Sequence, residues 1–195
     1  MIGALRGRIA AKTPPQLMID VGGVGYELEA PMSTFFHLPA IGQEVSLLTH
    51  LVVREDAQML YGFATPDERR LFRNLLKVSG VGPKIALALL SGISVEAFAQ
   101  CILNEDVAAL IRVPGIGRKT AERLFVEMRD RVSNLEGGAG TARSDGASPE
   151  SEALSALIGL GYKPAEAARL LKAVEAGAHT TEELIRRALQ GAARD

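Results

Sequence analysis

The sequence predicts a chain of three parts with mixed β and α content: a small β-barrel, a helical middle part, and a helical bundle behind a flexible link. Three observations support this division. Up to about residue 64 the apolar residues form short β-type runs, and from residue 65 they follow the period of a helix. A segment rich in Gly, Ser and Ala then separates the helical middle part from the last helical segment.

Residues 1–64 contain five short runs of β-forming composition that are separated by turn residues. The runs are LRGRIAA (5–11), QLMIDV (16–21), GYELEA (25–30), EVSLLTHLVV (44–53) and QMLYGF (58–63). Strands at this spacing are typical of a small barrel or sandwich. A short helix at 33–38 before the fourth run favours a five-stranded Greek-key barrel of the OB type, and we expect Met59, Leu60 and Phe63 in its core.

Residues 65–134 are predicted to be helical throughout. Thr65 is the expected N-cap of the first helix, with Pro66 at its first position and Glu68 completing a capping box. Further helices are expected after Ser94 and after Asn104, and Glu105 and Asp106 are assigned to a first helical turn. The expected later helices of this part cover residues 83–90, 95–102, 105–111 and 118–132.

Residues 135–149 read as a flexible link, because they have almost nothing to bury. The segment 150–195 then predicts a bundle of three short helices. The expected helices start at PESEALSALIGL (149–160), continue with KPAEAARLLKAV (163–174) and end with TTEELIRRAL (180–189). The last helix carries a capping box made by Thr180 and Glu183.

Two segments of the middle part, LLKVSGVGPKIALALL (75–90) and LIRVPGIGRKTAERLF (110–125), repeat at an offset of 35 residues. In each, an apolar helix ends at a Gly-aliphatic-Gly turn and a new helix opens. Glycine permits a positive φ and leaves no side chain over the backbone, and the first N–H groups of the new helix lack intrahelical acceptors. Each turn therefore predicts a binding site for one phosphate group. The matched positions include Gly80 with Gly115, Gly82 with Gly117, and Lys84 with Lys119.

The distribution of charge indicates the partner of these turns. The whole chain has a net charge of −1, but residues 67–134 carry eleven basic and eight acidic groups. Two equivalent phosphate-binding sites in the only segment with a net positive charge suit a nucleic acid that is bound by its backbone. The alternative is that such turns only join packed helices. Gly23-Val24-Gly25 is the same tripeptide, but a strand follows it and no lysine comes two residues later, so we interpret it as a simple turn.

Other chemistry finds little support in the sequence. GIGRKT lacks the glycine that a P-loop requires before its lysine, and Ile85 and Thr120 stand where a dinucleotide fingerprint needs a third glycine, so no nucleotide cofactor is expected. No metal site and no catalytic residue are expected. The residues weighed for such roles are His37, His50 and His179, which lie in different segments, and Cys101, which reads as a small core residue.

The single cysteine suits a reducing compartment, because it cannot form an intramolecular disulfide. No apolar run approaches the length that spans a bilayer, and the first residues lack the continuous core of a signal peptide. The sequence therefore predicts a cytoplasmic protein with no membrane partner.

The chain as a whole resembles the RuvA family, the Holliday-junction-binding subunits of the bacterial branch-migration complex. Tandem Gly-aliphatic-Gly turns of this kind resemble helix-hairpin-helix DNA-binding motifs. The likeness covers all three parts, and only the link is free in sequence. The stretches that carry it are MIGALRG, VGGVGYE, THLVVREDAQMLYGF, SGVGPKIALALLSG, PGIGRKTAERL and LGYKPAEA.

The resemblance implies an OB barrel, a double helix-hairpin-helix domain and a C-terminal three-helix domain. It also implies a homotetramer that holds a four-way junction open and nearly flat, with two tetramers able to sandwich it. The hexameric RuvB ATPase would be loaded through the C-terminal domain, and the RuvC resolvase would share the junction. ATP would be used by that motor, so the chain would act in recombination and DNA repair without a catalytic site or cofactor of its own.

The resemblance also assigns residues. At the tip between the last two strands, Glu55 and Asp56 read from the sequence alone as a solvated acidic turn, but the family implies an acidic pin at the crossover. Arg118 stands where the family usually has lysine, which keeps the charge. The implied phosphate contacts are Gly80, Val81, Gly82, Lys84, Gly115, Ile116, Gly117, Arg118, Lys119 and Arg123.

In the last part, Leu160, Gly161 and Tyr162 turn from one helix into the next. They either contact the motor or only hold the three helices together, and the sequence leaves both open. Two other functions also stay open. A repair nuclease or glycosylase would need a metal-binding carboxylate cluster or a nucleophilic lysine in a pocket, and the sequence indicates neither. A single-strand-binding protein would need stacking aromatics on the barrel. The barrel part offers Tyr26, Phe35, Phe36, Tyr61 and Phe63.

Overall fold

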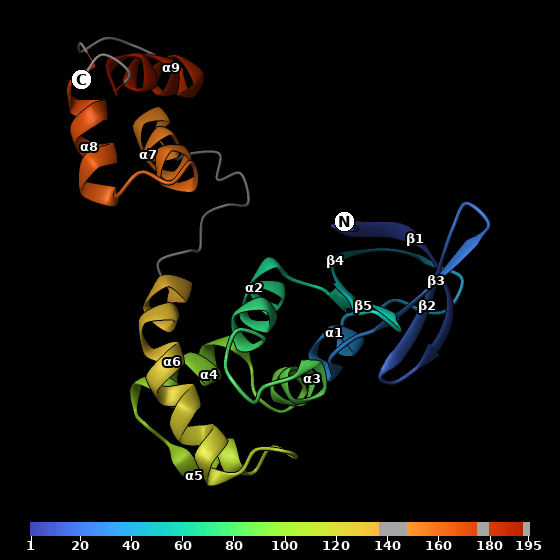
Figure 1. Cartoon of the computed structure of the whole chain (residues 1–195). Coiled ribbons are helices and arrows are strands. Elements are labelled where there is room, and N and C mark those ends of the chain that lie inside the picture. The colour runs from blue at the N-terminus through green and yellow to red at the C-terminus, as the bar shows by residue number, and fades with distance from the viewer. Residues whose placement is uncertain (137–147, 175–179, 193–195) are drawn as a thin grey trace. The chain divides into compact units, whose positions relative to one another are not determined.

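The computed structural model describes residues 1–136, 148–174 and 180–192 (Figure 1). The chain forms two compact units, Met1–Gly138 and Ala139–Asp195. The first unit holds a β-barrel and a set of helices, and the second is a small helical bundle. Most of the expected flexible link at 135–149 lies outside the described residues.

The first unit begins with a closed five-stranded barrel in the order β1-β2-β3-β5-β4. All strand pairs are antiparallel except β3 with β5, which meet at Glu29 and Tyr61. A short helix, α1 (Met32–Phe36), connects β3 to β4. This arrangement confirms the barrel of OB type that the sequence predicts. The strands are β1 (Ala4–Thr13), β2 (Gln16–Val21), β3 (Val24–Glu29), β4 (Glu44–Val53) and β5 (Gln58–Phe63).

The turn between β2 and β3 consists of Gly22 and Gly23, so only the first residue of the Gly23-Val24-Gly25 tripeptide lies in the predicted turn. Gly22 and Gly23 have φ values of 64° and 90°, which glycine adopts without strain. The Gly23 N–H donates to Asp20 Oδ1 at 2.7 Å, and β3 starts at Val24. Val24 and Gly25 are the first residues of β3, so the tripeptide leads into a strand and opens no helix.

Five helices follow the barrel in the first unit. Thr65 caps the first of them in the predicted capping box with Glu68, and Ser94 accepts from the Ala97 N–H as the predicted cap of α4. The helices are α2 (Pro66–Leu75), α3 (Pro83–Gly92), α4 (Val95–Leu103), α5 (Val107–Ile111) and α6 (Arg118–Glu136).

The start of α5 differs from the prediction. Asn104 is the C-cap of α4 rather than an N-cap, and Glu105 has a φ of 52° that no helix accommodates. Asp106 is the N-cap instead, because its Oδ1 accepts from the Ala109 N–H at 3.0 Å. Glu105 and Asp106 therefore precede the helix and do not form its first turn.

The barrel and the helices share a continuous apolar contact. Strand β5 is buried on both faces: Leu60 points into the barrel core, whereas Phe63 packs with the helical core. The Phe72 ring of α2 lies 4.9 Å from that of Phe63 and 5.0 Å from that of Tyr61. The expectation that Met59 and Phe63 belong to the barrel core is therefore wrong, because both face the helices.

A buried carboxylate reinforces this contact. Glu68 is only 6% exposed and lies at the point where α1, the end of β5 and α2 meet. Its Oε2 accepts from the Thr34 hydroxyl and the Ala64 N–H, both at 3.0 Å, and its Oε1 accepts from the Ser33 hydroxyl. The capping glutamate thus also ties the barrel to the helices.

The second unit contains α7 (Pro149–Gly159), α8 (Pro164–Lys172) and α9 (Thr181–Ala192) around a small core. The predicted capping box at the start of α9 is confirmed, because the Glu183 N–H donates to the Thr180 hydroxyl and the Thr180 N–H to the Glu183 carboxylate. In the described part of the chain no single helix is long and apolar enough to cross a membrane. Only α3 and α4 taken together reach that length, and they meet at a bend of 99°.

We predict that Glu68→Ala lowers the free energy of unfolding of the first unit by about 3 kcal/mol, because it leaves several donors without an acceptor in a buried position. Urea unfolding followed by circular dichroism measures this loss. Glu96→Ala is the matched control, since Glu96 lies exposed in the first turn of α4. Equal, small losses in both variants would contradict a structural role for the Glu68 carboxylate.

Candidate nucleic-acid interface

The sequence repeat is also a structural repeat. The first glycine turn (Gly80–Gly82) and the second glycine turn (Gly115–Gly117) begin with φ values of 86° and 87°. The backbone hydrogen bonds match as well: Val81 to Val78 at 3.0 Å and Ile116 to Val113 at 3.1 Å. Both turns therefore offer the same main-chain geometry to a ligand.

The central aliphatic residue of each turn points inward. The side chains of Val81 and Ile116 are each only 5% exposed and pack in the helical core. Only main-chain atoms of these two predicted contact residues can therefore face a ligand. Lys84 and Lys119, in the first turn of α3 and of α6, are exposed.

The second glycine of each turn is not required by the fold. Gly82 has an extended backbone with a φ of −92°, and Gly117 lies outside the left-handed region. A Cβ atom at either position would meet no atom within 4 Å. These glycines instead leave open space in front of the helix starts, as close approach by a ligand requires.

The helix starts present donors to this open space. Within the described residues, the N–H groups of Gly82 and Lys84 have no acceptor, and the same is true of Gly117 and Lys119. These groups lie at the positive ends of the dipoles of α3 and α6. Each glycine turn can therefore hold one anionic oxygen group with main-chain donors and a nearby ammonium.

The two repeats pack crosswise. Arg123 belongs to α6 of the second repeat, yet its Nη1 lies 3.2 Å from the Ser79 hydroxyl beside the first glycine turn. In return, a Cβ atom at Gly115 would lie 3.5 Å from Cγ1 of Ile85 in α3. The Arg123 guanidinium therefore supplements the first turn, a pairing that the spacing of the sequence does not reveal.

The cations differ in how much of their charge is already paired. Arg118 Nε lies 3.2 Å from Glu122 Oε1 in an exposed ion pair. Within the described residues, Lys84 and Lys119 form no ion pair. The two lysines are therefore the cations most available to a ligand at the turns.

Two exposed cations that the sequence analysis missed belong to the same repeat. Lys77 precedes the first glycine turn and Arg112 precedes the second, again 35 residues apart. The offset itself is the signal that could have identified them. Both lie just after the end of a helix, where a cation also stabilises the helix dipole.

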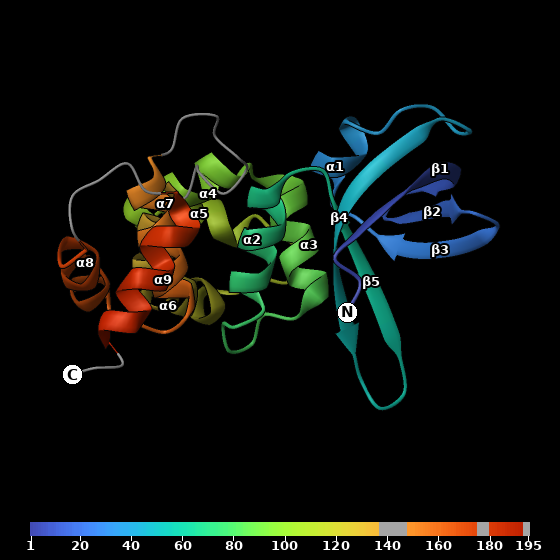
Figure 2. The ribbon, with the colours of Figure 1, turned by 90° about the horizontal axis from the view of Figure 1, so that it is seen from above.

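The predicted acidic residues lie at the tip of the β4–β5 hairpin. The hairpin closes through a hydrogen bond from the Arg54 N–H to the Ala57 carbonyl at 2.8 Å, and Glu55 and Asp56 between them are exposed. Figure 2 shows this hairpin projecting beyond the rest of the barrel. We call Glu55 and Asp56 the acidic tip.

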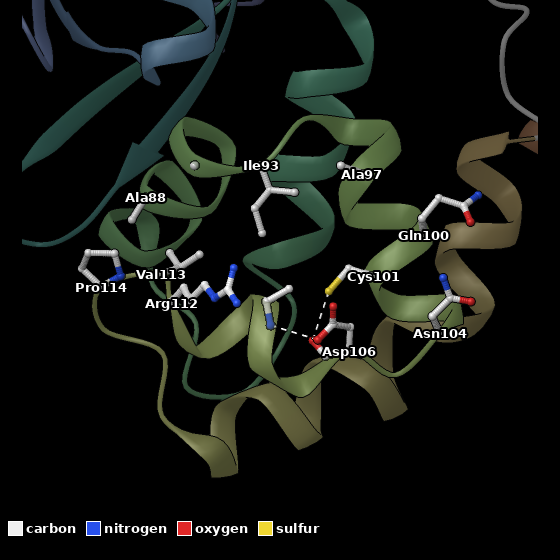
Figure 3. Close-up of a pocket in the computed structure, with 12 residues that line it drawn as sticks. Ala88, Ile93, Ala97, Gln100, Cys101, Asn104, Asp106, Arg112, Val113 and Pro114 are labelled. Carbon is white, nitrogen blue, oxygen red and sulfur yellow. Dashed lines mark hydrogen bonds between the residues drawn. The ribbon is translucent and has the colours of Figure 1, made fainter.

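A cavity of about 660 Å³ between α3, α4 and α5 has no evident catalytic chemistry (Figure 3). Its carboxylate, Asp106, caps α5, and Cys101 donates to the Asp106 carbonyl at 3.3 Å. Burial, with a smaller effect of Asp106, raises the pKa of the Cys101 thiol, which disfavours the nucleophilic thiolate. Among the described residues, no three His, Cys, Asp or Glu side chains gather as metal ligands would.

The two described histidines make local contacts. His50 packs its ring edge-on against Phe72, with centroids 5.7 Å apart. His37 is exposed, and its Nδ1 lies 2.8 Å from the Ser33 carbonyl oxygen. The third candidate, His179, lies outside the described residues.

In the second unit, the predicted partner-binding residues form a helix stop. Gly161 has a φ of 103°, and the Tyr162 N–H donates to the Leu157 carbonyl at 3.2 Å, as in a Schellman motif. Tyr162 packs against the small core, whereas Leu160 is 62% exposed. This turn thus combines a structural residue with an exposed apolar one.

These features define a class: a protein with tandem helix-hairpin-helix motifs built onto an OB-type barrel. Comparison with known proteins agrees with this class. Residues 1–62 match the RuvA N-terminal domain, residues 72–130 a SAM-like tandem helix-hairpin-helix, and residues 148–193 the RuvA C-terminal domain.

Two curated relatives match nearly the whole chain. Both are named Holliday junction branch migration complex subunit RuvA. The protein of Thioalkalivibrio sulfidiphilus is 56% identical, over 97% of this chain and 98% of its own. That of Alkalilimnicola ehrlichii is 57% identical over the full length of both chains. The chain belongs to the RuvA family.

The two glycines of one turn should respond differently to substitution. Gly80→Ala should lower the free energy of unfolding by about 1.5 kcal/mol, because alanine is strained at positive φ. Gly82→Ser should leave it unchanged or slightly raised, since serine is at least as good an N-cap as glycine and has open space there. Urea unfolding of both variants tests this, and an equal loss in the two would contradict the assignment.

Proposed function

We propose that this chain binds four-way DNA junctions by their backbones, as a subunit of a branch-migration complex. The observation that carries this proposal is the matched pair of glycine turns, with equal backbone geometry, open space and free N–H donors. Two equal anion sites suit a ligand with repeating phosphates and read no base sequence. The name of the relatives supplies the junction as the ligand.

The proposed contacts with DNA phosphates lie at the two glycine turns of the first unit. At the first turn they are the main chain of Gly80, Val81 and Gly82 with Lys84 and Arg123, and at the second the main chain of Gly115, Ile116 and Gly117 with Arg118 and Lys119. The acidic tip is proposed as a pin at the crossover. Its carboxylates repel phosphates there and favour the parting of the bases.

The proposed assembly is a homotetramer, whose four-fold symmetry matches four arms, with two tetramers able to enclose one junction. The second unit recruits the RuvB motor, and Leu160, Gly161 and Tyr162 are proposed as part of that contact. The exposure of Leu160 supports this role. RuvC acts on the same junction, and the complex works in the cytoplasm. The parts proposed for these tasks are 1–64 (barrel), 65–134 (DNA-binding helices), 135–149 (link) and 150–195 (motor contact).

The alternatives are less well supported. A nuclease would need a cluster of metal-binding carboxylates, and the described residues contain none. A glycosylase would need a lysine in a pocket, and no lysine lines the cavity of Figure 3. A single-strand-binding barrel requires several exposed stacking aromatics. Of the five candidates, Phe35, Tyr61 and Phe63 are buried, Tyr26 is half-buried, and only Phe36 is largely exposed. The chain acts as an accessory subunit, and the ATPase activity belongs to its partner.

The test of the proposed function is a gel-shift comparison of a four-way junction with linear duplex of the same arm sequence. Preferential binding of the junction, independent of sequence, is the expected result. Equal affinity for both DNAs would contradict the proposal.

Lys84→Ala and Lys119→Ala should each weaken junction binding equally on every sequence. Each lost phosphate contact should lower the slope of log affinity against log salt by about 0.9, because fewer counterions are released. Fluorescence anisotropy at several salt concentrations measures the slope. Gly82→Ser should also weaken binding, because its side chain occupies the open space. A changed base preference with an unchanged slope would contradict the phosphate assignment.

Substituting the acidic tip should have the opposite effect on affinity. Glu55→Gln with Asp56→Asn should bind junctions at least as tightly as the wild-type chain, because the repulsion of phosphates is removed, and should discriminate less against linear duplex. The ratio of the two dissociation constants measures this discrimination. A higher ratio in the double variant would contradict a pin at the crossover.

A further inference from the structure

Three cations of the first unit are spaced four residues apart. Arg69 and Arg73 lie in α2, and Lys77 follows the end of that helix. Residues four apart share one face of a helix, and like charges at this spacing destabilise it. This stripe runs from the barrel end of α2 toward the first glycine turn. The helix carries a repulsion that an anion beside it would relieve.

The two arginines are held in place by neutral groups. Arg73 Nε donates to His50 Nδ1 on β4 at 3.3 Å, and Arg69 Nη1 donates to the Gly3 carbonyl at 2.8 Å. Helix α2 packs on β4 (Figure 2). The side chains of Arg69, Arg73 and His50 are each partly buried there. Because Nδ1 of His50 accepts, its proton lies on Nε2, which is a further donor.

Within the described residues, neither Arg69 nor Arg73 pairs with a carboxylate. The neighbouring acids of α2 are used elsewhere: Asp67 pairs with Arg70, and Glu68 binds the hydroxyls of α1. Burial first, and then Arg73, lowers the pKa of Arg69. Burial first, followed by Arg73 and Arg69, lowers the pKa of His50. The cluster is thus a partly buried region of uncompensated positive potential.

We propose that Arg69, Arg73 and His50 form a further phosphate-binding site, which contacts the DNA backbone between the acidic tip and the first glycine turn. Guanidinium and imidazole N–H groups are suitable donors for phosphate oxygens. This inference rests on the proposed function, because it extends the same DNA-binding surface.

The position of the cluster favours DNA over a second copy of the chain. His50 lies on β4, the strand that leads directly to the acidic tip, three residues before its end at Val53. Helix α2 leads in the other direction, through Lys77, to the first glycine turn. A DNA backbone that contacts both the acidic tip and the first glycine turn would pass along this face. An acidic group of a second copy of the chain would have no such reason to lie between them.

The test compares Arg69→Gln/Arg73→Gln with Arg6→Gln/Arg8→Gln, a pair of equal charge on the exposed side of β1. The first pair should lower the salt slope of junction binding by about 1.8, whereas the control pair should leave it unchanged. If the wild-type chain binds junctions and the two double variants have the same salt slope, the proposed site is wrong but the proposed function stands. A wild-type chain that binds no junction would refute the function itself.

Two further measurements test the proposed site even if the substitutions alter the oligomeric state of the chain. Inorganic phosphate titrated into the wild-type protein should shift the His50 ring resonance in NMR spectra, and the Arg69→Gln/Arg73→Gln chain should show no such shift. Absence of a shift in the wild type would overturn the proposal. A lower mass by light scattering, with the salt slope retained, would instead assign the arginines to a contact between copies.

Discussion

The buried carboxylate of Glu68 and the ring contact of Phe72 with Phe63 fix the geometry on which the site depends. Glu68 belongs to α2 and accepts from two parts of the barrel, α1 and the residue after β5, while it caps α2. The acidic tip belongs to the barrel and the glycine turns belong to the helices. This joint, together with the packing of α1 on α3 and of α2 on β4, holds the acidic tip and the glycine turns in one compact unit.

Repetition gives the second constraint. Two turns with closely matching φ values and matching hydrogen bonds present equal groups of main-chain donors, which suits the proposed recognition of repeating phosphates. The repeats are not equal in their side chains. Arg123 crosses to the first turn, where Ser79 holds it, while Arg118 shares its charge with Glu122. The two turns therefore have equivalent backbones but differ in the cations beside them.

Much of this architecture could be predicted from local signals. Capping residues located α2 and α9, and glycine spacing located both turns, because each signal acts within a few residues. The failures involve competition and long-range packing. Asn104 and Asp106 are both suitable N-cap residues. Only the structure shows that Asn104 is the C-cap of α4 and Asp106 is the N-cap of α5. Met59 and Phe63 follow the pattern of a barrel strand, but the helices cover their face.

The site was only partly accessible to the same reasoning. The sequence predicts contacts at both glycine turns, and the structure adds that the side chains of Val81 and Ile116 are buried, which leaves only their backbones for such contacts. Arg73 and His50 could not be paired from the sequence, because 23 residues separate them and neither belongs to a motif. Their proximity follows from the packing of α2 on β4, which Glu68 and Phe72 maintain. The interaction that holds the barrel to the helices therefore also creates the positive region between the acidic tip and the first glycine turn.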